Sequence, residues 1–424
     1  MLSVQVLTRE TIKPSTPTPP HLKFLDLSFL DQCLPNFSIN VILFYSAGHS
    51  NGIREISHHL RSSLSDVLTR FYPLAGRVKK HHPSSDKIYV ECNDEGVEFT
   101  TARVERDLHS FLADPPINEL GLLFPGGGSS FSSYDEPLLS VQFNEFTPGG
   151  GWALGVSMSH KLADGTSYAE FLKAWADTAR GRGVPALRPK FESAALFPQR
   201  DVAPEIEFMP VVQSIIAPAR LLIRARQLEK LRGYARERAR PTRVEAVIAL
   251  LWRCAIRAAG GVARGRRLEA AVPVNLRPRL RPPLTEDCFG NIFAMVYASG
   301  DGWEGAEEHE QGFLEGRLRE AISGLNGATH EDLGMTVAVA EGVERYLFTS
   351  WCRFPFYETD FGWGGPAWVA VPPCNLKNCF VLMNARGGDG FEVWAFLTEA
   401  EMEGFAKDPE LLAFTSSPGS VFMH

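Results

Sequence analysis

Apolar and polar positions follow two different periods along the chain. Residues 41–45 (VILFY), 87–92 and 152–159 (WALGVSMS) are apolar or alternating segments of strand length, and this pattern predicts β-strands. Over residues 60–71 the apolar positions recur with helical spacing, and Pro73 then ends the helix. The first half of the chain is therefore predicted to contain both strands and helices.

The second half shows the same mixture. Residues 244–259 predict a mostly apolar helix, and residues 329–348 predict another helical stretch. Near the C-terminus, the glycine-rich segment Arg386–Gly390 lies between two apolar strand-like segments. Because glycine allows the positive φ angles of tight turns, this segment predicts a β-hairpin.

Two segments rich in proline divide the chain. Residues 13–20 (KPSTPTPP) predict an extended surface segment. Residues 181–219 carry many glycines and prolines without sustained periodicity, and we interpret them as a crossover between two domains. The predicted domains are therefore residues 1–180 and 220–424.

Charge and hydropathy exclude several classes of function. The 424 residues include 43 Lys+Arg and 50 Asp+Glu, a net charge of −7, which disfavours binding to a phosphate backbone. The apolar run 246–252 is too short to span a membrane, and charge at Arg9 interrupts any secretory signal. We expect a cytoplasmic protein with neither a nucleic-acid nor a membrane partner.

The seven cysteines are odd in number and scattered, which is unlike a disulfide scaffold. We expect reduced, buried thiols. The closest pair, Cys374 and Cys379, has no neighbouring histidine to complete a zinc site, so no bound metal is expected.

Candidate chemistry gathers between a strand and a helix. His160 and Asp164 follow the strand 152–159, and Ser167 with Glu170 has the spacing of a capping box that opens a helix. His160 and Asp164 would then lie on a short connection, where a rigid scaffold presents side chains to a cleft. Catalytic bases are often found on such connections.

The His-x-x-x-Asp spacing occurs twice. His82 and Asp86 have the same spacing as His160 and Asp164, but they lie in a polar segment rich in turn residues. We therefore expect His82 and Asp86 to form a surface turn without a chemical role.

Two motifs together resemble a known family. Residues 159–165 (SHKLADG) and 360–364 (DFGWG) resemble the paired HxxxDG and DFGWG motifs of the plant BAHD acyl-CoA-dependent acyltransferases. The opening segments 13–19 and 27–32 resemble the subgroup that acylates alkaloid, terpenoid and other specialised alcohols. Further family-like segments are FYPLAGR at 71–77, QFNEF at 142–146, PTRVEA at 241–246, VNLR at 274–277 and CFGN at 288–291.

The resemblance implies a fold and a reaction. The fold would consist of two similar-sized α/β domains with mixed sheets, like chloramphenicol acetyltransferase, with a solvent channel between them. Acyl-CoA and a small-molecule alcohol would enter this channel and meet at His160. A neutral imidazole can take the proton of the alcohol as the new bond forms, so His160 is the expected general base and no covalent enzyme intermediate is needed.

The resemblance also assigns structural roles. Asp164 and Gly165 are expected to shape the loop, with Asp164 paired to Arg277, or less favourably to Arg279. In the second motif, Asp360, Gly362 and Gly364 are expected to hold a tight backbone path. The indole N–H of Trp363 has the character needed to support an oxyanion.

The CoA phosphates need donors from the second half. Thr242, Arg243 and Asn291 lie in family-like segments and are the candidate contacts. The basic run 220–240 predicts an exposed helix face. Other available arginines are Arg264, Arg266, Arg267, Arg277, Arg279 and Arg281.

The expected acyl donor is short and neutral, most simply acetyl-CoA, because Ile292 follows Asn291 where the malonyl-transferring relatives carry a different residue. A monomer is expected from the family. Three alternatives remain: a hydroxycinnamoyl- or benzoyl-CoA transferase of the same family, a non-catalytic member that acts as an interaction protein, and a carrier-dependent condensation domain. Ser159 stands where such condensation domains have a first histidine.

Overall fold

The structure is a computed structural model that describes residues 1–46, 52–127, 134–181, 188–201, 215–234, 240–260, 267–301, 312–327 and 342–416. The α-helices of this part of the chain are α1 (Phe29–Gln32), α2 (Ile53–Leu68), α3 (Leu108–Ala113), α4 (Gly165–Ala179), α5 (Ser193–Leu196), α6 (Ala225–Tyr234), α7 (Arg243–Ala258), α8 (Phe313–Ser323), α9 (Glu399–Ala406) and α10 (Pro409–Phe414). The strands are β1 (Val4–Ile12), β2 (Phe24–Asp26), β3 (Ser38–Tyr45), β4 (Arg77–Lys80), β5 (Ile88–Glu91), β6 (Val97–Val104), β7 (Leu139–Phe146), β8 (Trp152–Ser159), β9 (Ile216–Arg224), β10 (Arg267–Asn275), β11 (Phe293–Ser299), β12 (Val343–Ser350), β13 (Trp368–Ala370), β14 (Cys379–Asn384) and β15 (Gly390–Thr398).

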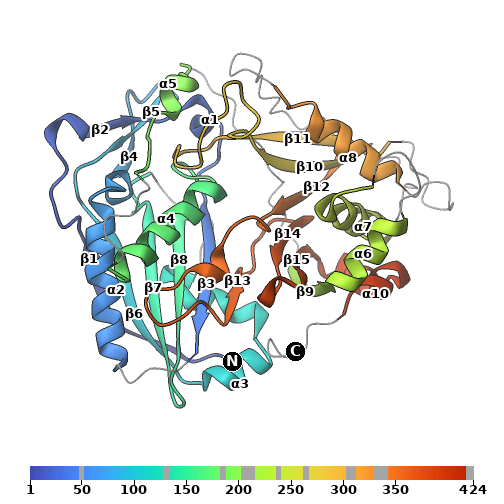
Figure 1. Cartoon of the computed structure of the whole chain (residues 1–424), viewed down its shortest axis with the longest axis horizontal. Coiled ribbons are helices and arrows are strands. Elements are labelled where there is room, and N and C mark those ends of the chain that lie inside the picture. The colour runs from blue at the N-terminus through green and yellow to red at the C-terminus, as the bar shows by residue number, and fades with distance from the viewer. Residues whose placement is uncertain are drawn as a thin grey trace.

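Within the described residues, two six-stranded mixed sheets organise the fold (Figure 1). The first has the order β1-β6-β7-β8-β3-β13, with β6 and β7 parallel and the other pairs antiparallel. The second has the order β11-β10-β12-β14-β15-β9, with β12 parallel to both of its neighbours. A small sheet, β2-β5-β4, completes the first half. The predicted α/β class with mixed sheets is confirmed.

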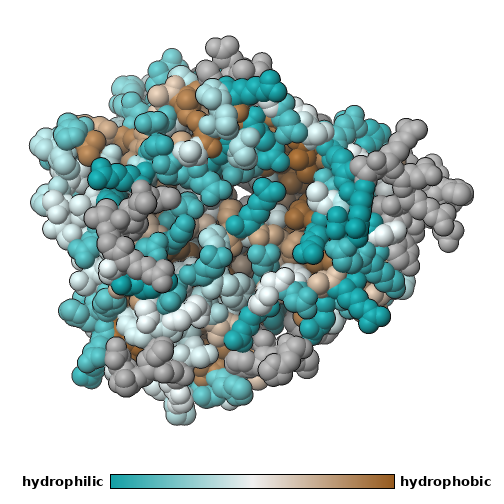
Figure 2. Space-filling model, in the orientation of Figure 1, coloured by the Kyte–Doolittle hydropathy of each residue, from teal (hydrophilic) through white to brown (hydrophobic). Residues whose placement is uncertain are grey.

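The two halves of the molecule share a hydrophobic core. Side chains of the first sheet and of helices α2 and α4 pack in one cluster with one face of the second sheet, including Trp394 and Phe396. The other face of the second sheet packs against α7, α8 and α9. The surface is hollowed near the middle of the view in Figure 2, where the two halves meet. The domain boundaries at 180 and 220 stay a prediction. Strand β13, from the second half of the chain, completes the first sheet, so that sheet is not built from residues 1–180 alone.

Several sequence-predicted elements are confirmed. Residues 41–45 lie in β3, 87–92 contain β5, and 152–159 form β8. The hairpin is formed by β14 and β15, which pair antiparallel from Cys379 with Phe396 to Asn384 with Phe391. The glycines of the connecting turn, Gly387, Gly388 and Gly390, have φ angles of 77°, 74° and 128°, which side chains with a Cβ rarely adopt.

The predicted helices shift at their ends. Helix α2 begins at Ile53, before the predicted start at residue 60. The pattern missed its first turns because they are mostly polar. Helix α7 agrees with the prediction, and Thr242 with Glu245 forms its capping box. The capping box expected at Ser167 is wrong. Asp164 is the N-cap of α4, and its carboxylate accepts from the Ser167 backbone N–H at 2.8 Å.

One prediction for the second half is wrong, and another is wrong in part. Residues 343–350 form the strand β12 rather than a helix. This strand lies between two neighbours and is mostly buried, so its apolar residues do not alternate. The remainder of the predicted helical stretch, 329–341, lies outside the described residues. The basic run 220–240 begins within β9, where Arg220 is buried and ion-paired with Glu392 at 3.0 Å. Its residues 225–234 form the helix α6, in which Arg226 and Lys230 are exposed as predicted.

The predicted crossover is shorter in the structure than in the prediction. Strand β9 begins at Ile216, inside the predicted crossover 181–219, of which residues 182–187 and 202–214 lie outside the described part. All seven cysteines are free thiols, buried or half-buried. Among the described residues, no helix is both long and apolar enough to cross a membrane.

Candidate active site

His160 lies directly after β8, where the two halves of the molecule meet. Its backbone N–H donates to the Phe37 carbonyl at 2.7 Å. The imidazole packs beside the ring of Phe37, with centroids 4.7 Å apart, and beside Phe293 of β11 at 5.9 Å. Residues from both halves therefore enclose this side chain, which stays partly exposed.

Asn291, from the connection between β10 and β11, fixes the tautomer of His160. Its Oδ1 lies 2.9 Å from Nδ1 of His160. A carbonyl oxygen only accepts hydrogen bonds, so Nδ1 carries the proton. The lone pair of the neutral ring is then on Nε2, which is the atom that can take a proton from a substrate.

The surroundings of His160 also favour its neutral form. Burial is the largest influence, and it lowers the pKa of His160 below the usual 6.5 because a desolvated imidazolium is disfavoured. The charge of Asp164 and the hydrogen bond to Asn291 oppose this shift without cancelling it. A neutral imidazole at physiological pH is the state that a general base requires.

The predicted ion pair of Asp164 with Arg277 is present. Arg277 Nη1 donates to Asp164 Oδ2 at 2.6 Å, and Nη2 donates to Oδ1 at 3.2 Å. Both side chains are buried. Burial by itself would raise the pKa of Asp164, but the Arg277 charge and the backbone N–H groups of Ser167 and Ile292 lower it overall. The less favoured partner, Arg279, donates instead to the Asn275 carbonyl.

This ion pair ties the loop to the second half of the chain. Arg277 also donates to the carbonyl oxygens of Cys288 and Gly290 and to the Ser167 hydroxyl. The carboxylate of Asp164 is thus occupied by donors that hold α4 against the connection between β10 and β11. These contacts agree with a structural role for Asp164, as predicted.

The absence of a side chain at Gly165 has a steric explanation. A Cβ at this position would lie 2.6 Å from the ring of Phe354, which is closer than real Cβ contacts. The first residue of α4 must therefore be small for the helix to approach that ring.

The second motif forms a tight loop after the short helical turn Phe356–Glu358. Asp360 Oδ1 accepts from the backbone N–H groups of Gly362 at 2.8 Å and Gly364 at 2.9 Å, and Oδ2 lies 3.5 Å from Arg180 at the end of α4. Gly362 and Gly364 have φ angles of 111° and 87°. The predicted structural role of the aspartate and both glycines agrees with this geometry.

The predicted oxyanion role of Trp363 is wrong. Its ring packs edge-on against Trp152, at the start of β8, and against His59 of α2. His160 follows the opposite end of the same eight-residue strand, and a strand of that length spans roughly 25 Å. The indole N–H of Trp363 therefore cannot reach an oxyanion beside His160.

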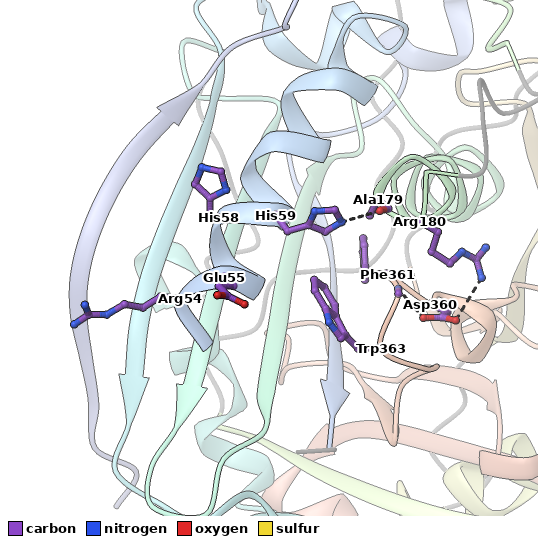
Figure 3. A pocket seen from close by; sticks show the side chains of 10 residues that line it. Arg54, Glu55, His58, His59, Ala179, Arg180, Asp360, Phe361 and Trp363 are labelled. Atoms are coloured by element: carbon purple, nitrogen blue, oxygen red, sulfur yellow. Dashed lines mark hydrogen bonds and ion pairs between the residues drawn. The ribbon is translucent and has the colours of Figure 1, made fainter. Parts of the chain in front are cut away.

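Trp363 instead lines a cavity of about 830 Å³. Figure 3 shows it between α2, the end of α4 and the DFGWG loop, with Trp363 beside His59 and Arg180 directed at Asp360. His59 Nε2 lies 2.7 Å from the Ala179 carbonyl. His160 is not among the described residues that line this cavity, so the cavity is separate from the candidate base.

The predicted CoA contacts are placed as follows. Asn291 is fully buried, and its side-chain atoms contact His160 and Asp31, so the prediction that it contacts CoA is wrong. Thr242 caps α7, and Arg243 lies 3.6 Å from Glu229. These two stay predictions. Arg264 and Arg266 lie outside the described residues.

Asp31 is a site residue that the sequence analysis missed. It is fully buried in α1, and its Oδ1 accepts from Asn291 Nδ2 at 2.7 Å and from the Asn291 backbone N–H at 3.1 Å. The only local signal was the spacing of Ser28 and Asp31, which form a capping box. His82, from the second His-x-x-x-Asp spacing, is exposed and contacts Ser84, as expected of a surface turn.

Residues 2–412 match the Transferase family. Stemmadenine O-acetyltransferase from Catharanthus roseus is 36% identical over 426 residues, which cover 96% of each chain. Limonoid 21-O-acetyltransferase from Citrus sinensis is 35% identical and covers 99% of this chain and 100% of its own. The crystal structure of vinorine synthase superposes with a TM-score of 0.86 at 34% identity, and the match covers 99% of this chain and 100% of that one. The chain therefore belongs to the Transferase family, that of the BAHD acyl-CoA-dependent acyltransferases.

Proposed function

We propose that this acyltransferase moves an acyl group from acyl-CoA to a hydroxyl group of a small alcohol, with His160 as the general base. The observation that carries the proposal is the contact of His160 Nδ1 with Asn291 Oδ1 at 2.9 Å, which leaves the basic lone pair on Nε2. The lowered pKa of His160 supports it, because the ring then stays neutral.

The transfer needs no covalent enzyme intermediate. Nε2 of His160 accepts the proton of the alcohol while its oxygen bonds to the thioester carbon, which gives a tetrahedral intermediate. This intermediate collapses as the C–S bond breaks, and the imidazolium returns the proton to the departing CoA sulfur. The products are the ester and free CoA, and His160 is neutral again.

We propose acetyl-CoA as the donor and a hydroxyl of a hydrophobic specialised metabolite as the acceptor. Two full-length relatives carry names that specify acetyl transfer to oxygen, on stemmadenine and on a limonoid. Ile292 after Asn291, unlike the segment of malonyl-transferring relatives, agrees with a neutral donor. We also propose that the protein is a cytoplasmic monomer. The free thiols support the cytoplasmic location, because cysteines stay reduced there.

The test of the base compares two histidines that have the same local spacing. His160→Ala should stay folded and lose at least about 10²-fold in turnover, which is the usual contribution of general-base catalysis. His82→Ala, a surface substitution, should retain wild-type turnover and melting temperature. Turnover of His160→Ala close to wild type, or equal losses in both variants, would contradict the assignment.

The substrates are tested by pairing acetyl-, malonyl-, benzoyl- and hydroxycinnamoyl-CoA with alkaloid, terpenoid and simple aromatic alcohols, and by measuring product mass and free CoA. The expected result is ester formation with acetyl-CoA. Preference for another donor would keep the family and overturn the donor. Intact CoA binding without any product would favour a non-catalytic interaction protein, and a requirement for a carrier-bound thioester would favour a condensation domain.

A further inference from the structure

The side chain of Asn291 can present either its oxygen or its nitrogen to His160. With Oδ1 toward the imidazole, Nδ1 is protonated and Nε2 is basic. With Nδ2 toward the imidazole, the amide would donate to Nδ1, and the ring proton would move to Nε2. That second tautomer cannot accept a proton from the alcohol. Catalysis thus depends on which way this amide points.

The carboxylate of Asp31 determines this direction. Its Oδ1 accepts from Asn291 Nδ2 at 2.7 Å, and Nδ2 also donates to the backbone carbonyl of His160 at 2.7 Å. An ionised carboxylate offers no donor, so reversing the amide would place its oxygen against two acceptors in a buried site. Such unsatisfied buried contacts are costly.

Asp31 is itself held firmly. Its Oδ2 accepts from the backbone N–H of Ser28 at 2.6 Å and from the Ser28 hydroxyl at 2.7 Å. Lys161, next to His160, donates to the backbone carbonyls of Asp31 and Gln32 at 3.4 and 3.2 Å. Burial raises the pKa of Asp31 to about 6, although the hydrogen bonds from Ser28 and Asn291 lower it. This pKa lies below neutral pH, and each carboxylate oxygen accepts from a backbone N–H, so the carboxyl group is ionised at neutral pH.

We propose that Asp31 is a positioning residue of the acyl transfer: through Asn291 it selects the tautomer of His160 in which Nε2 is basic. Asp31 does not touch the reacting atoms, and its effect passes through one amide. This inference rests on the proposed function of His160 as the base. It extends the site to α1, more than one hundred residues before the His-x-x-x-Asp motif.

Asp31→Asn is the informative substitution because it keeps the shape and changes one acceptor to a donor. Each side of the carboxylate faces a backbone N–H, from Ser28 on one side and from Asn291 on the other. An amide has one oxygen, so it can satisfy only one side. When that oxygen faces Ser28, its nitrogen faces Asn291 Nδ2, so the unreversed Asn291 amide would set two donors against each other. Reversal removes this clash, leaves Oδ1 against only the His160 carbonyl, and presents Nδ2 to His160.

The decisive readout is the ¹⁵N spectrum of the imidazoles at neutral pH, with the His160 signals identified from their loss in His160→Ala. The wild type should show Nδ1 protonated, and Asp31→Asn should show a shift toward protonated Nε2. The kcat should fall by roughly 10²-fold, with the KM for acyl-CoA little changed. A wild type with protonated Nε2 would overturn the inference without any variant.

The matched control is Glu401→Gln. Glu401 is also a buried capping-box carboxylate, which accepts from the Thr398 hydroxyl at 2.7 Å at the start of α9. It should lose stability as Asp31→Asn does, while its kcat and the His160 tautomer stay those of the wild type. Equal falls in kcat in both variants would mean that the loss reflects folding alone.

A double-substitution cycle separates positioning from general destabilisation. If Asp31 acts through Asn291, then Asp31→Asn in the background of Asn291→Ala should add almost nothing to the loss of kcat. Additive losses, or an unchanged tautomer in a folded Asp31→Asn, would overturn the inference. Failure of the proposed function is a different result: His160→Ala would then retain turnover.

Discussion

At the residue scale, the candidate base depends on contacts that lie far from it in the sequence. His160 is held by the Phe37 carbonyl, by the rings of Phe37 and Phe293, and by the amide of Asn291. These neighbours limit hydration of the ring and orient it, but they place no carboxylate directly on its Nδ1. The result is an imidazole that prefers to be neutral.

The pH dependence of turnover should show this preference. Because burial lowers the pKa of His160, the ring loses its basic lone pair to protonation only below the usual value of 6.5. We expect kcat/KM to be constant near neutral pH and to fall with acidification, with a midpoint below 6.5. The measurement is a pH–rate profile with a direct titration of the His160 imidazole by NMR. A midpoint above 6.5 in both would mean that charge interactions, rather than burial, dominate.

Part of this site could be predicted from the sequence, and part could not. His160, Asp164 and Arg277 lie in recognisable motifs, so the family resemblance assigned them. The contact of His160 with Asn291 spans 131 residues, and that of Asn291 with Asp31 spans 260. Side-chain hydrogen bonds over such separations leave no periodic pattern in the sequence. Trp363 was misplaced for a related reason, since a motif does not say which end of a strand it contacts.

At the scale of elements, one buried carboxylate holds the end of the loop between β8 and α4 to three partners. Asp164 caps α4 through the Ser167 N–H, accepts from Ile292 N–H at 3.0 Å, and pairs with Arg277. One side chain therefore joins a helix N-terminus to the connection between β10 and β11. The position of His160, four residues earlier, follows from this arrangement.

Asp164→Asn should mainly reduce stability. The asparagine oxygen can still cap α4, but Arg277 would remain buried without a counter-charge, and breaking such a pair costs roughly 3–5 kcal/mol of unfolding free energy. Chemical denaturation should show this loss. A matched variant on the same helix is Asp177→Asn, whose partner Arg180 is more exposed, and which should cost at most about 1 kcal/mol. A variant Asp164→Asn that unfolds like wild type yet has no turnover would move Asp164 into the chemistry.

The elements themselves differ in how visible they are in a sequence. The hairpin of β14 and β15 was predicted because its turn needs glycine, and α7 because its apolar stripe is long. Strand β12 was missed because it lies centrally and is covered on both faces. Strand β9 contains Pro218 and two arginines, and only tertiary structure shows that Arg220 pairs with Glu392. The three-residue β13 is too short to give a pattern.

At the scale of the whole molecule, β13 connects the two halves. It pairs antiparallel with β3, so a segment after the DFGWG loop completes the first sheet. Its Trp368 stacks on Phe44 of β3, with centroids 5.1 Å apart, and on Trp394 of β15 at 6.0 Å. The indole N–H donates to Glu392 at 3.1 Å, and Arg220 lies over the ring. One buried side chain thus contacts both sheets.

Trp368→Ala should therefore weaken the coupling between the halves as well as the core. Truncation of a buried tryptophan costs about 3–5 kcal/mol. Trp252→Ala is the control, because Trp252 is equally buried but lies wholly within the core formed by α7 and the second sheet. Calorimetric and van't Hoff enthalpies should agree for the wild type and for Trp252→Ala, since the hydrophobic cluster shared by the two sheets stays intact and the halves unfold together. For Trp368→Ala the van't Hoff enthalpy should fall below the calorimetric one, because the halves then melt separately. Agreement of the two enthalpies in Trp368→Ala would show that other contacts between the sheets are sufficient to couple them.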